Sequence, residues 1–320
     1  MLLSFRGSLA AMALVGISSL PGVALAKEPP AGAPPGKVEW KRGWDRFTPA
    51  EAAFTTALTV GAYVLDKKMP DYPEPKWDFE VPLLDPAVRG LFRARTAENQ
   101  EVWVRWSDIG FRSLVLFPYI VDAGIVALGV HRNADVAAQL FFIDLQSLTF
   151  AGLSQLVTSR LTSRTRPFVQ DCADDNRSAR HVCGETREHR SFYGGHASAA
   201  FTSAGLTCLH HQHIPLYGGG APDAWACVWA LSFASLTAMA RIGADEHWAS
   251  DTVIGVGTGW LFGYLVPRWL HYGTTRTRPQ SLIGRLMIPG RTVAGDRSFL
   301  WAPQFSPSDD GGVLAVRAAF

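Results

Sequence analysis

Charged residues are scarce in this 320-residue chain: they make up 18% of it, against 48% hydrophobic residues. The 30 Lys and Arg residues nearly balance the 28 Asp and Glu residues, which leaves a net charge of +2. That charge is too small for the basic face that binding to a nucleic-acid backbone requires, so we expect no nucleic-acid partner. The apolar content is enough for a large core and excludes a disordered or collagen-like chain.

Cysteine is also rare, with four residues at Cys172, Cys183, Cys208 and Cys227. An even number of cysteines pairs readily in an oxidising compartment. We predict the disulfides Cys172–Cys183 and Cys208–Cys227, because each pair encloses a short polar or glycine-rich segment. Four reduced, buried thiols are the alternative.

The N-terminus has the pattern of an export signal. Residues 1–26 contain one charge, Arg6, followed by an apolar run, a break at Pro21 and the small residues Ala24 and Ala26. This order predicts a signal peptide cleaved after Ala26, with an uncleaved membrane anchor as the alternative. Residues 27–47, rich in Pro and Gly, are expected to form a linker.

Alternating strand patterns are lacking through most of the chain, and the apolar stretches have helical length. We therefore predict an all-α fold, a bundle of five to six core helices over residues 110–270. Residues 48–109 form an N-terminal helix and a Pro-rich connecting segment, and residues 271–320 form an irregular tail with a short strand after Gly311-Gly312. The expected helices are 49–65, 93–106, 112–130, 134–160, 196–212, 222–242 and 250–270, with a loop at 70–88.

Some of these helices are candidates for membrane spans. The stretches at 222–242 and 250–270 are long and apolar enough to cross a bilayer. The stretches at 112–130 and 134–160 contain Asp122 and Asp144, which are costly in a membrane interior. We expect an exported protein, in the inner membrane with a site facing the periplasm, or alternatively a soluble periplasmic bundle.

Three clusters of reactive residues lie at the ends of the predicted helices. If successive helices run antiparallel, all three clusters fall at one end of the bundle. They are Ser163-Arg164-Thr165-Arg166-Pro167, Ser191 to Ser198 with Gly194-Gly195-His196 in it, and Arg241 with His247 and Asp251.

The chemistry of these clusters suits a phosphate group. The four-residue spacing of His247 and Asp251 puts both side chains on one helix face, where the carboxylate can hold one imidazole N–H. Two glycines before His196 open a helix whose bare N–H groups favour an anion. Arg166 and Arg241 supply planar guanidinium groups that match phosphate geometry.

The order of these residues resembles the type 2 phosphatidic acid phosphatase family, which includes bacterial class A acid phosphatases and vanadium haloperoxidases. The family motifs are Lys-x6-Arg-Pro, Pro-Ser-Gly-His and Arg-x5-His-x3-Asp. This chain keeps Arg166-Pro167 of the first, Gly195-His196 of the second, and Arg241, His247 and Asp251 of the third. It departs from the family at Ser159, which takes the place of the lysine, and at Tyr193-Gly194, which take the place of Pro-Ser. Arg160 or Arg164 is expected to replace the lysine.

The resemblance implies a helical bundle of this family and a phosphatase that needs no cofactor or metal. His247 would be the nucleophile, Asp251 its orienting group and His196 the acid and base. Phosphate would bind to Arg166, Arg241 and the amides of Gly194 and Gly195. The expected substrate is a phosphorylated lipid or another small phosphate ester.

Other functions stay open. They are a soluble periplasmic acid phosphatase of broad specificity, a vanadate-dependent haloperoxidase, and a protein that binds phospholipid without turnover. The run His210-His211-x-His213 suggests a metal site, but it lies at the opposite end of its helix from the other clusters and is expected to lack carboxylate neighbours, so we expect no metal there.

Overall fold

A computed structural model describes residues 37–69, 75–77, 81, 83–172, 183–184, 186–272, 302–306 and 313–317. The predicted signal peptide and residues 27–36 lie outside the described residues. The chain divides into two compact units, Met1–Ser281 and Leu282–Phe320, each described by itself.

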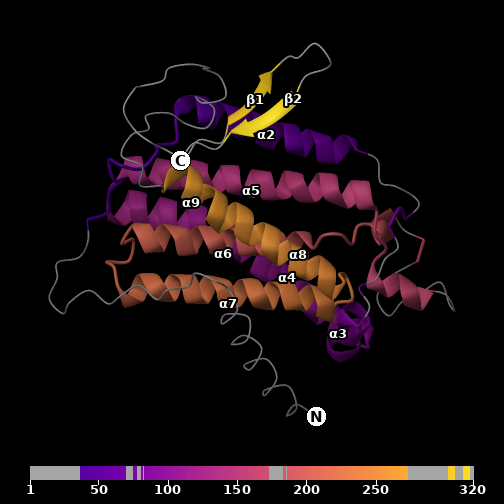
Figure 1. Cartoon of the computed structure of the whole chain (residues 1–320). Helices are drawn as coiled ribbons and strands as arrows, with labels where there is room; N and C mark the ends of the chain where they lie inside the picture. Colours follow the sequence, from indigo (N-terminus) through magenta and orange to yellow (C-terminus); the bar gives the residue numbers. More distant parts are fainter. Residues whose placement is uncertain are drawn as a thin grey trace. The chain divides into compact units, whose positions relative to one another are not determined.

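The first unit is a bundle of helices, which confirms the predicted all-α class. Figure 1 shows α5, α6 and α7 running side by side, with α3 at one end of the bundle next to α7 and α8. The elements are α2 (Pro49–Lys68), α3 (Leu84–Phe92), α4 (Ala97–Phe117), η1 (Pro118–Val130), α5 (Ala134–Thr162), η2 (Pro167–Cys172), η3 (Thr186–His189), α6 (Gly195–His213), α7 (Ala221–Gly243), α8 (Ala249–Trp260), η4 (Leu261–Leu265) and α9 (Val266–His271).

Helix α6 is the centre of the bundle and packs against α4, α5, α7, α8 and η4. It is buried almost all round and is built mostly of Gly, Ala, Ser and Thr, with the larger side chains Leu206 and Leu209 in the core. Small side chains let neighbouring helices approach closely, and each fully buried leucine contributes roughly 1.5–3 kcal/mol to stability. The catalytic candidate His196 is the second residue of this central helix.

A row of glycines on α8 and η4 brings that segment into backbone contact with α6. A Cβ atom added to Gly255 would lie 2.7 Å from the carbonyl oxygen of Gly194, and one added to Gly259 would lie 2.4 Å from that of Ser198. At Gly263 the separation from the carbonyl oxygen of Thr202 would be 2.1 Å. This glycine row, Gly255, Gly259 and Gly263, therefore holds the segment after Asp251 against the helix that begins beside His196.

The structure differs from the sequence-based expectation in three places. The region expected as a loop at 70–88 contains the start of α3, and the helices expected at 93–106 and 112–130 form one continuous helix, Ala97–Val130. The second half of the expected linker packs on the core, because its large apolar side chains are buried: Val38, Trp40, Trp44 and Phe47. Trp40 and Trp44 contact the ring of Tyr272.

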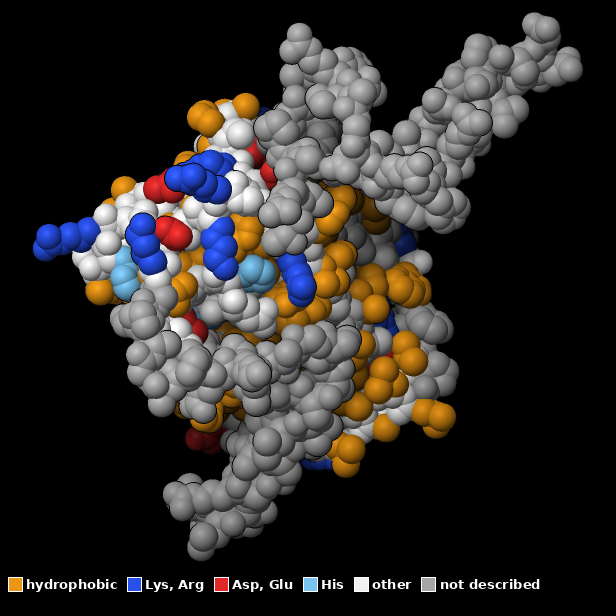
Figure 2. Space-filling model, turned by 60° about the vertical axis from the view of Figure 1, so that its left-hand side comes forward, with side chains coloured by type: hydrophobic (Ala, Val, Ile, Leu, Met, Phe, Trp, Pro, Cys, Tyr) orange, Lys and Arg blue, Asp and Glu red, His pale blue; other side chains and the backbone are white. Residues whose placement is uncertain are grey.

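Three helices in the described part of the chain are long and apolar enough to cross a membrane: Ala97–Val130, Ala134–Cys172 and Ala221–Gly243. The helix at 250–270, expected as a span, is not one of them, whereas the two helices that carry Asp122 and Asp144 are. Both aspartates are buried in the bundle, which removes their charge from the outer surface. Figure 2 shows apolar side chains over a broad part of one face.

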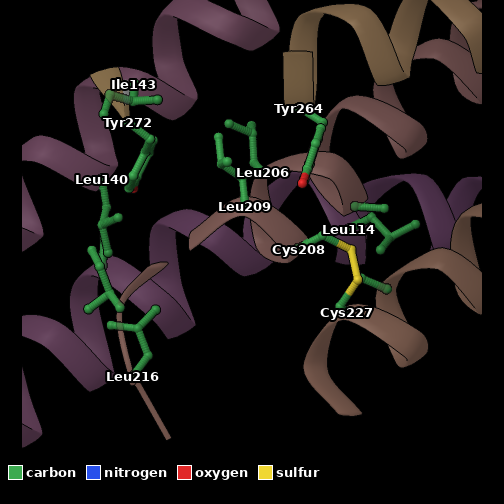
Figure 3. Close-up of a cluster of buried hydrophobic side chains, with 14 of the residues drawn as sticks. Leu114, Leu140, Ile143, Leu206, Cys208, Leu209, Leu216, Cys227, Tyr264 and Tyr272 are labelled. Atoms are coloured by element: carbon green, nitrogen blue, oxygen red, sulfur yellow. A yellow bond between two sulfur atoms is a disulfide. The ribbon is translucent and has the colours of Figure 1, made fainter. Parts of the chain in front are cut away.

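Both predicted disulfides are present, Cys172–Cys183 and Cys208–Cys227. Figure 3 shows the second within the buried apolar cluster, beside Leu114. In the second unit, β1 (Ala302–Ser306) pairs antiparallel with β2 (Val313–Arg317), with Gln304 opposite Ala315. The strand expected after Gly311-Gly312 is thus the second strand of a hairpin.

Candidate functional site

The first cluster follows the C-terminus of α5, where Ser163 adopts a left-handed conformation that ends the helix. The amide of Arg166 donates a hydrogen bond to the carbonyl oxygen of Glu188 (2.8 Å), which fixes the chain just before Pro167. The Arg166 side chain is largely buried and forms an ion pair through NH1 with Oε2 of Glu246. Arg166 thereby reaches the loop that carries His247.

The second cluster opens α6. The amide of Gly194 donates to the carbonyl oxygen of Asp251 (3.1 Å), so this N–H is already occupied, and the amide of Gly195 is the first of the helix. The side chain of His196 lies 3.1 Å, from Nε2, to Oδ1 of Asp108 on α4, and its ring lies 4.8 Å from the ring of Phe111. With 28% of its side chain exposed, His196 is accessible from outside the core.

The third cluster joins α7 to α8. Arg241, in the last turn of α7, lies 3.2 Å from Oε2 of Glu246 through NH2 and 4.0 Å from Oδ1 of Asp108 through NH1. Glu246 thus contacts the arginines of two different clusters, and Asp108 contacts His196 as well as Arg241. The three clusters meet at one end of the bundle.

The imidazole of His247 is held by a main-chain carbonyl group. Its Nδ1 lies 2.7 Å from the carbonyl oxygen of Ser191 but 3.9 Å from Oδ2 of Asp251, beyond hydrogen-bond distance. Asp251 accepts hydrogen bonds from the Ser191 hydroxyl (2.5 Å) and from the Trp248 amide (3.0 Å). The expected direct hydrogen bond between His247 and Asp251 is therefore absent. Ser191 connects the two residues instead: its carbonyl oxygen contacts the imidazole and its hydroxyl group binds the carboxylate.

The two arginines expected to replace the missing lysine lie elsewhere. Arg160 is paired with Asp66 at the end of α2 (3.0 Å). Arg164 is buried between two carboxylates, 2.5 Å from Oδ1 of Asp251 and 2.8 Å from Oδ2 of Asp85. The ion pair between Arg164 and Asp251 is inside the protein, so Arg164 helps to position Asp251.

Burial and positive charge keep both histidines neutral. Burial lowers the pKa of His247 to about 4; Arg166 and Arg241 act in the same direction, and Asp251 acts against them. Burial, followed by the charges of Arg241 and His247, lowers the pKa of His196 to about 2. For Asp251, burial alone would raise the pKa, but contacts with His247, Arg164 and Ser191 bring it below its ordinary value.

Helix α3 supplies positioning residues that the sequence did not reveal. Asp85 is fully buried and accepts hydrogen bonds from the amide and hydroxyl of Ser250, both at 2.8 Å, at the start of α8. One turn later, Arg89 binds Asp245 through two hydrogen bonds of 2.8 Å. The four-residue spacing of Asp85 and Arg89 is compatible with one face of a helix. The prolines between residues 70 and 88 had nevertheless indicated a loop there.

The histidine run at the far end of α6 has carboxylate neighbours, which corrects the expectation. His210 contacts Oδ1 of Asp144 and the hydroxyl group of Tyr272, both at 2.8 Å. His211 lies between Asp223 (2.5 Å) and Asp122 (3.3 Å). These aspartates come from η1, α5 and α7, so the contacts connect those three elements to α6.

One group in the described part of the chain has the proximity of a metal site: Cys172, Cys183 and Glu188. The two sulfur atoms are bonded to each other in a disulfide, so they are not thiolate ligands. We therefore assign no metal to these three residues.

Comparison with known proteins finds a family match over the region that contains the three clusters. The sequence model of the PAP2 superfamily matches residues 141–275. Lipid A 1-phosphatase from Porphyromonas gingivalis is 37% identical over 75 residues, which cover 23% of this chain and 15% of that protein. The chain thus matches a small part of this relative's length. No solved structure matches the chain significantly.

Proposed function

Because residues 141–275 belong to the PAP2 superfamily, we propose that the protein is a phosphatase that cleaves a phosphomonoester or diphosphate through a phosphohistidine at His247. The observation that carries the proposal is the state of the His247 ring. Its Nδ1 faces the carbonyl oxygen of Ser191 and so carries the proton, while its lowered pKa keeps the ring neutral. Nε2 then has a free lone pair, which a nucleophile needs.

In the first step Nε2 of His247 attacks phosphorus, and the bond between phosphorus and the leaving oxygen breaks in line. His196 donates a proton to that oxygen, and in the second step takes one from the water that hydrolyses the phosphohistidine. Burial is the largest cause of the lowered pKa of His196, and the positive charges of Arg241 and Arg166 lower it further. A phosphate group bound to these arginines offsets that charge, so substrate binding favours the protonated acid.

Arg166 and Arg241 bind the phosphate oxygens that do not react, where they stabilise charge in the transition state. Asp251 orients His247 indirectly. It accepts a hydrogen bond from the Ser191 hydroxyl group, and the Ser191 carbonyl oxygen accepts one from the His247 imidazole. The geometry favours Arg166 and Arg241 over Arg160 and Arg164 as phosphate ligands. Arg166 and Arg241 both reach Glu246, the residue next to His247, whereas Arg160 pairs with Asp66 and Arg164 with Asp85 and Asp251.

We propose a lipid phosphate or diphosphate as substrate. Three apolar helices are compatible with a membrane location, and a relative named for a lipid phosphatase supports this substrate class. The aromatic ring of Phe111 lies beside His196, which gives the leaving-group side of the site an apolar wall.

A soluble exported phosphatase is a second candidate, and one observation favours it. The Cys208–Cys227 disulfide joins α6 to α7 toward the end of α6 that is remote from His196. In a protein whose site faces the periplasm across the membrane, that end faces the reducing cytoplasm, where disulfides are rare.

The test of the catalytic assignment compares two variants on two substrates. We expect His247→Ala to lose phosphate release from both p-nitrophenyl phosphate and phosphatidic acid, because the nucleophile itself is gone. We expect His196→Ala to lose roughly 10²–10⁴-fold on phosphatidic acid and much less on the aryl phosphate, whose leaving group departs without a proton.

His131→Gln is the matched control, because His131 is exposed and contacts the carbonyl oxygen of Leu216, away from the three clusters. With a radiolabelled substrate the wild type should accumulate acid-labile, base-stable label. Label that still accumulates in His247→Ala would assign the nucleophile to another residue.

A further inference from the structure

Glu246 is a buried carboxylate placed between the two arginines of the proposed phosphate site. Only 2% of its surface is exposed. Its Oε2 forms an ion pair with NH1 of Arg166 and lies 3.2 Å from NH2 of Arg241. No motif in the sequence singles it out, because a glutamate beside a histidine in a turn is ordinarily a solvated surface charge.

The carboxylate contacts one nitrogen of each guanidinium, NH1 of Arg166 and NH2 of Arg241, and so occupies donors that suit a phosphate group. Guanidinium groups bind carboxylate and phosphate oxygens in the same planar geometry, so the two anions compete for one set of donors. The other end of the Arg241 guanidinium faces Ser107 (3.3 Å) and Asp108 (4.0 Å). A phosphate group that binds NH1 of Arg166 and NH2 of Arg241 must therefore displace the Glu246 carboxylate.

The main chain around Glu246 is held by hydrogen bonds, so we expect any such movement to be confined to the side chain. The Glu246 amide donates to the carbonyl oxygen of Arg241 (3.0 Å). The preceding residue, Asp245, is held by two hydrogen bonds from Arg89. His247 can thus stay in place while the neighbouring carboxylate turns away from the arginines.

We propose that Glu246 is a specificity-determining residue that competes with phosphate for Arg166 and Arg241. This inference rests on the proposed function. A small anion such as inorganic phosphate has only the arginines to bind and is held weakly. A phosphate ester with a large apolar group gains further contacts outside the arginine pair, and these offset the loss of the Glu246 ion pairs. The product phosphate loses those contacts and is displaced by the returning carboxylate.

The test measures binding of inorganic phosphate by calorimetry, which does not depend on turnover. Glu246→Gln keeps the shape of the side chain and removes its charge, so we expect its dissociation constant for phosphate to fall by about tenfold or more. The KM for p-nitrophenyl phosphate should fall by a larger factor than the KM for phosphatidic acid. Glu39→Gln, a change in an exposed pair with Lys37, is the control and should bind phosphate as the wild type does.

Unchanged or weaker phosphate binding in Glu246→Gln would overturn the proposal, because Glu246 would then only hold the arginines in place. If that variant fails to fold, Glu246→Asp keeps the charge but is too short to reach both arginines, and tighter phosphate binding is again expected. A structure of the wild type with bound phosphate offers a check without any variant: the Glu246 carboxylate should have left both arginines.

The two proposals fail in different ways. A wild-type protein that binds phosphate but releases none from any ester would contradict the proposed phosphatase function and leave the phosphate-binding comparison intact. A wild type that turns over, with Glu246→Gln binding phosphate no more tightly, would contradict only the role of Glu246. A wild type with neither binding nor turnover would contradict both.

Discussion

The surroundings of the His247 side chain on balance keep it uncharged, although Asp251 favours the charged form. The side chain is buried, and the guanidinium groups of Arg166 and Arg241 add positive charge nearby. Both effects disfavour the imidazolium form, so the pKa lies at about 4 instead of near the usual value for histidine.

Activity should therefore persist into acid. Protonation removes the lone pair of the nucleophile, and with a pKa of about 4 this happens only when the pH falls well below the usual histidine range. The acid limb of log kcat/KM against pH should lie at higher pH in Arg166→Gln than in the wild type, because loss of one positive charge raises the pKa of His247. Both proteins are compared on p-nitrophenyl phosphate, which cancels the ionisation of the substrate. Its leaving group departs without a proton from His196, so the acid limb reports His247.

Arg105→Gln is the control for this shift, because Arg105 is exposed and pairs with Glu101 on the surface of α4. Its acid limb should coincide with that of the wild type. Two results would contradict a lowered pKa of His247. One is a wild-type acid limb near the ordinary pKa of histidine, and the other is an acid limb in Arg166→Gln that does not shift.

The order and spacing of the three clusters, together with their resemblance to the family motifs, selected His196, His247, Asp251 and the two arginines as candidates. Side-chain type and helical period are visible in a sequence. The sequence could not reveal that the carbonyl oxygen of Ser191 is the partner of His247 Nδ1. Every residue has a carbonyl group, so a main-chain acceptor leaves no mark in the sequence. Asp108 was missed for a related reason: it lies on a separate helix, and only the packing of α4 against α6 brings it to His196.

At the scale of elements, the glycine row on α8 and η4 sets the distance between two helices that carry the site. In Gly259→Ala the new Cβ would meet the carbonyl oxygen of Ser198 at 2.4 Å and the Cβ of Phe201 at 2.8 Å. Neither atom can move without shifting α6. We expect this overpacking to destabilise the fold by about 1–3 kcal/mol, measured by thermal or denaturant unfolding.

Gly257→Ala is a matched control on the same helix, because nothing lies within 4 Å of a Cβ added there. Alanine is the better helix former, so this variant should melt at or slightly above the wild-type temperature. Equal melting of the two alanine variants would show that α8 and α6 are not in the close contact described.

The long helices were predictable because their apolar stretches are uninterrupted; α2 and α5 through α9 follow the expected ranges closely. Helix α3 was not, because it is short and Pro86 lies in its first turn, a position that a helix tolerates. A nine-residue helix gains little from its own hydrogen bonds and depends on tertiary contacts. Those contacts, from Asp85 to Ser250 and from Arg89 to Asp245, join residues far apart in the sequence.

For the whole molecule, the outer surface is the strongest indication of its environment. In the helix Ala97–Val130 only 28% of the most apolar window is buried. Large apolar side chains on it are about half exposed or more, among them Trp106, Ile109, Leu116, Ile120, Ile125, Leu128 and Val130. A surface of this kind is stable in contact with lipid and costly in water.

We expect the expressed protein to stay with membranes after washing with alkaline carbonate and with high salt, and to be released by detergent. Release by carbonate would instead identify the soluble exported bundle, to which the Cys208–Cys227 disulfide points. A known periplasmic protein and a known inner-membrane protein in the same preparation serve as controls for each fraction.

The glycine row has a consequence for engineering. Because α6 and α8 touch through main-chain atoms, the separation of His196 from the segment after His247 does not depend on any outward-facing side chain. The exposed side chains of α4 and η1 can then be substituted without changing that separation. Replacing the apolar side chains among them with polar ones should give a protein that needs no detergent and whose candidate site residues keep their spacing. If the proposed phosphatase function holds, activity should be retained in water.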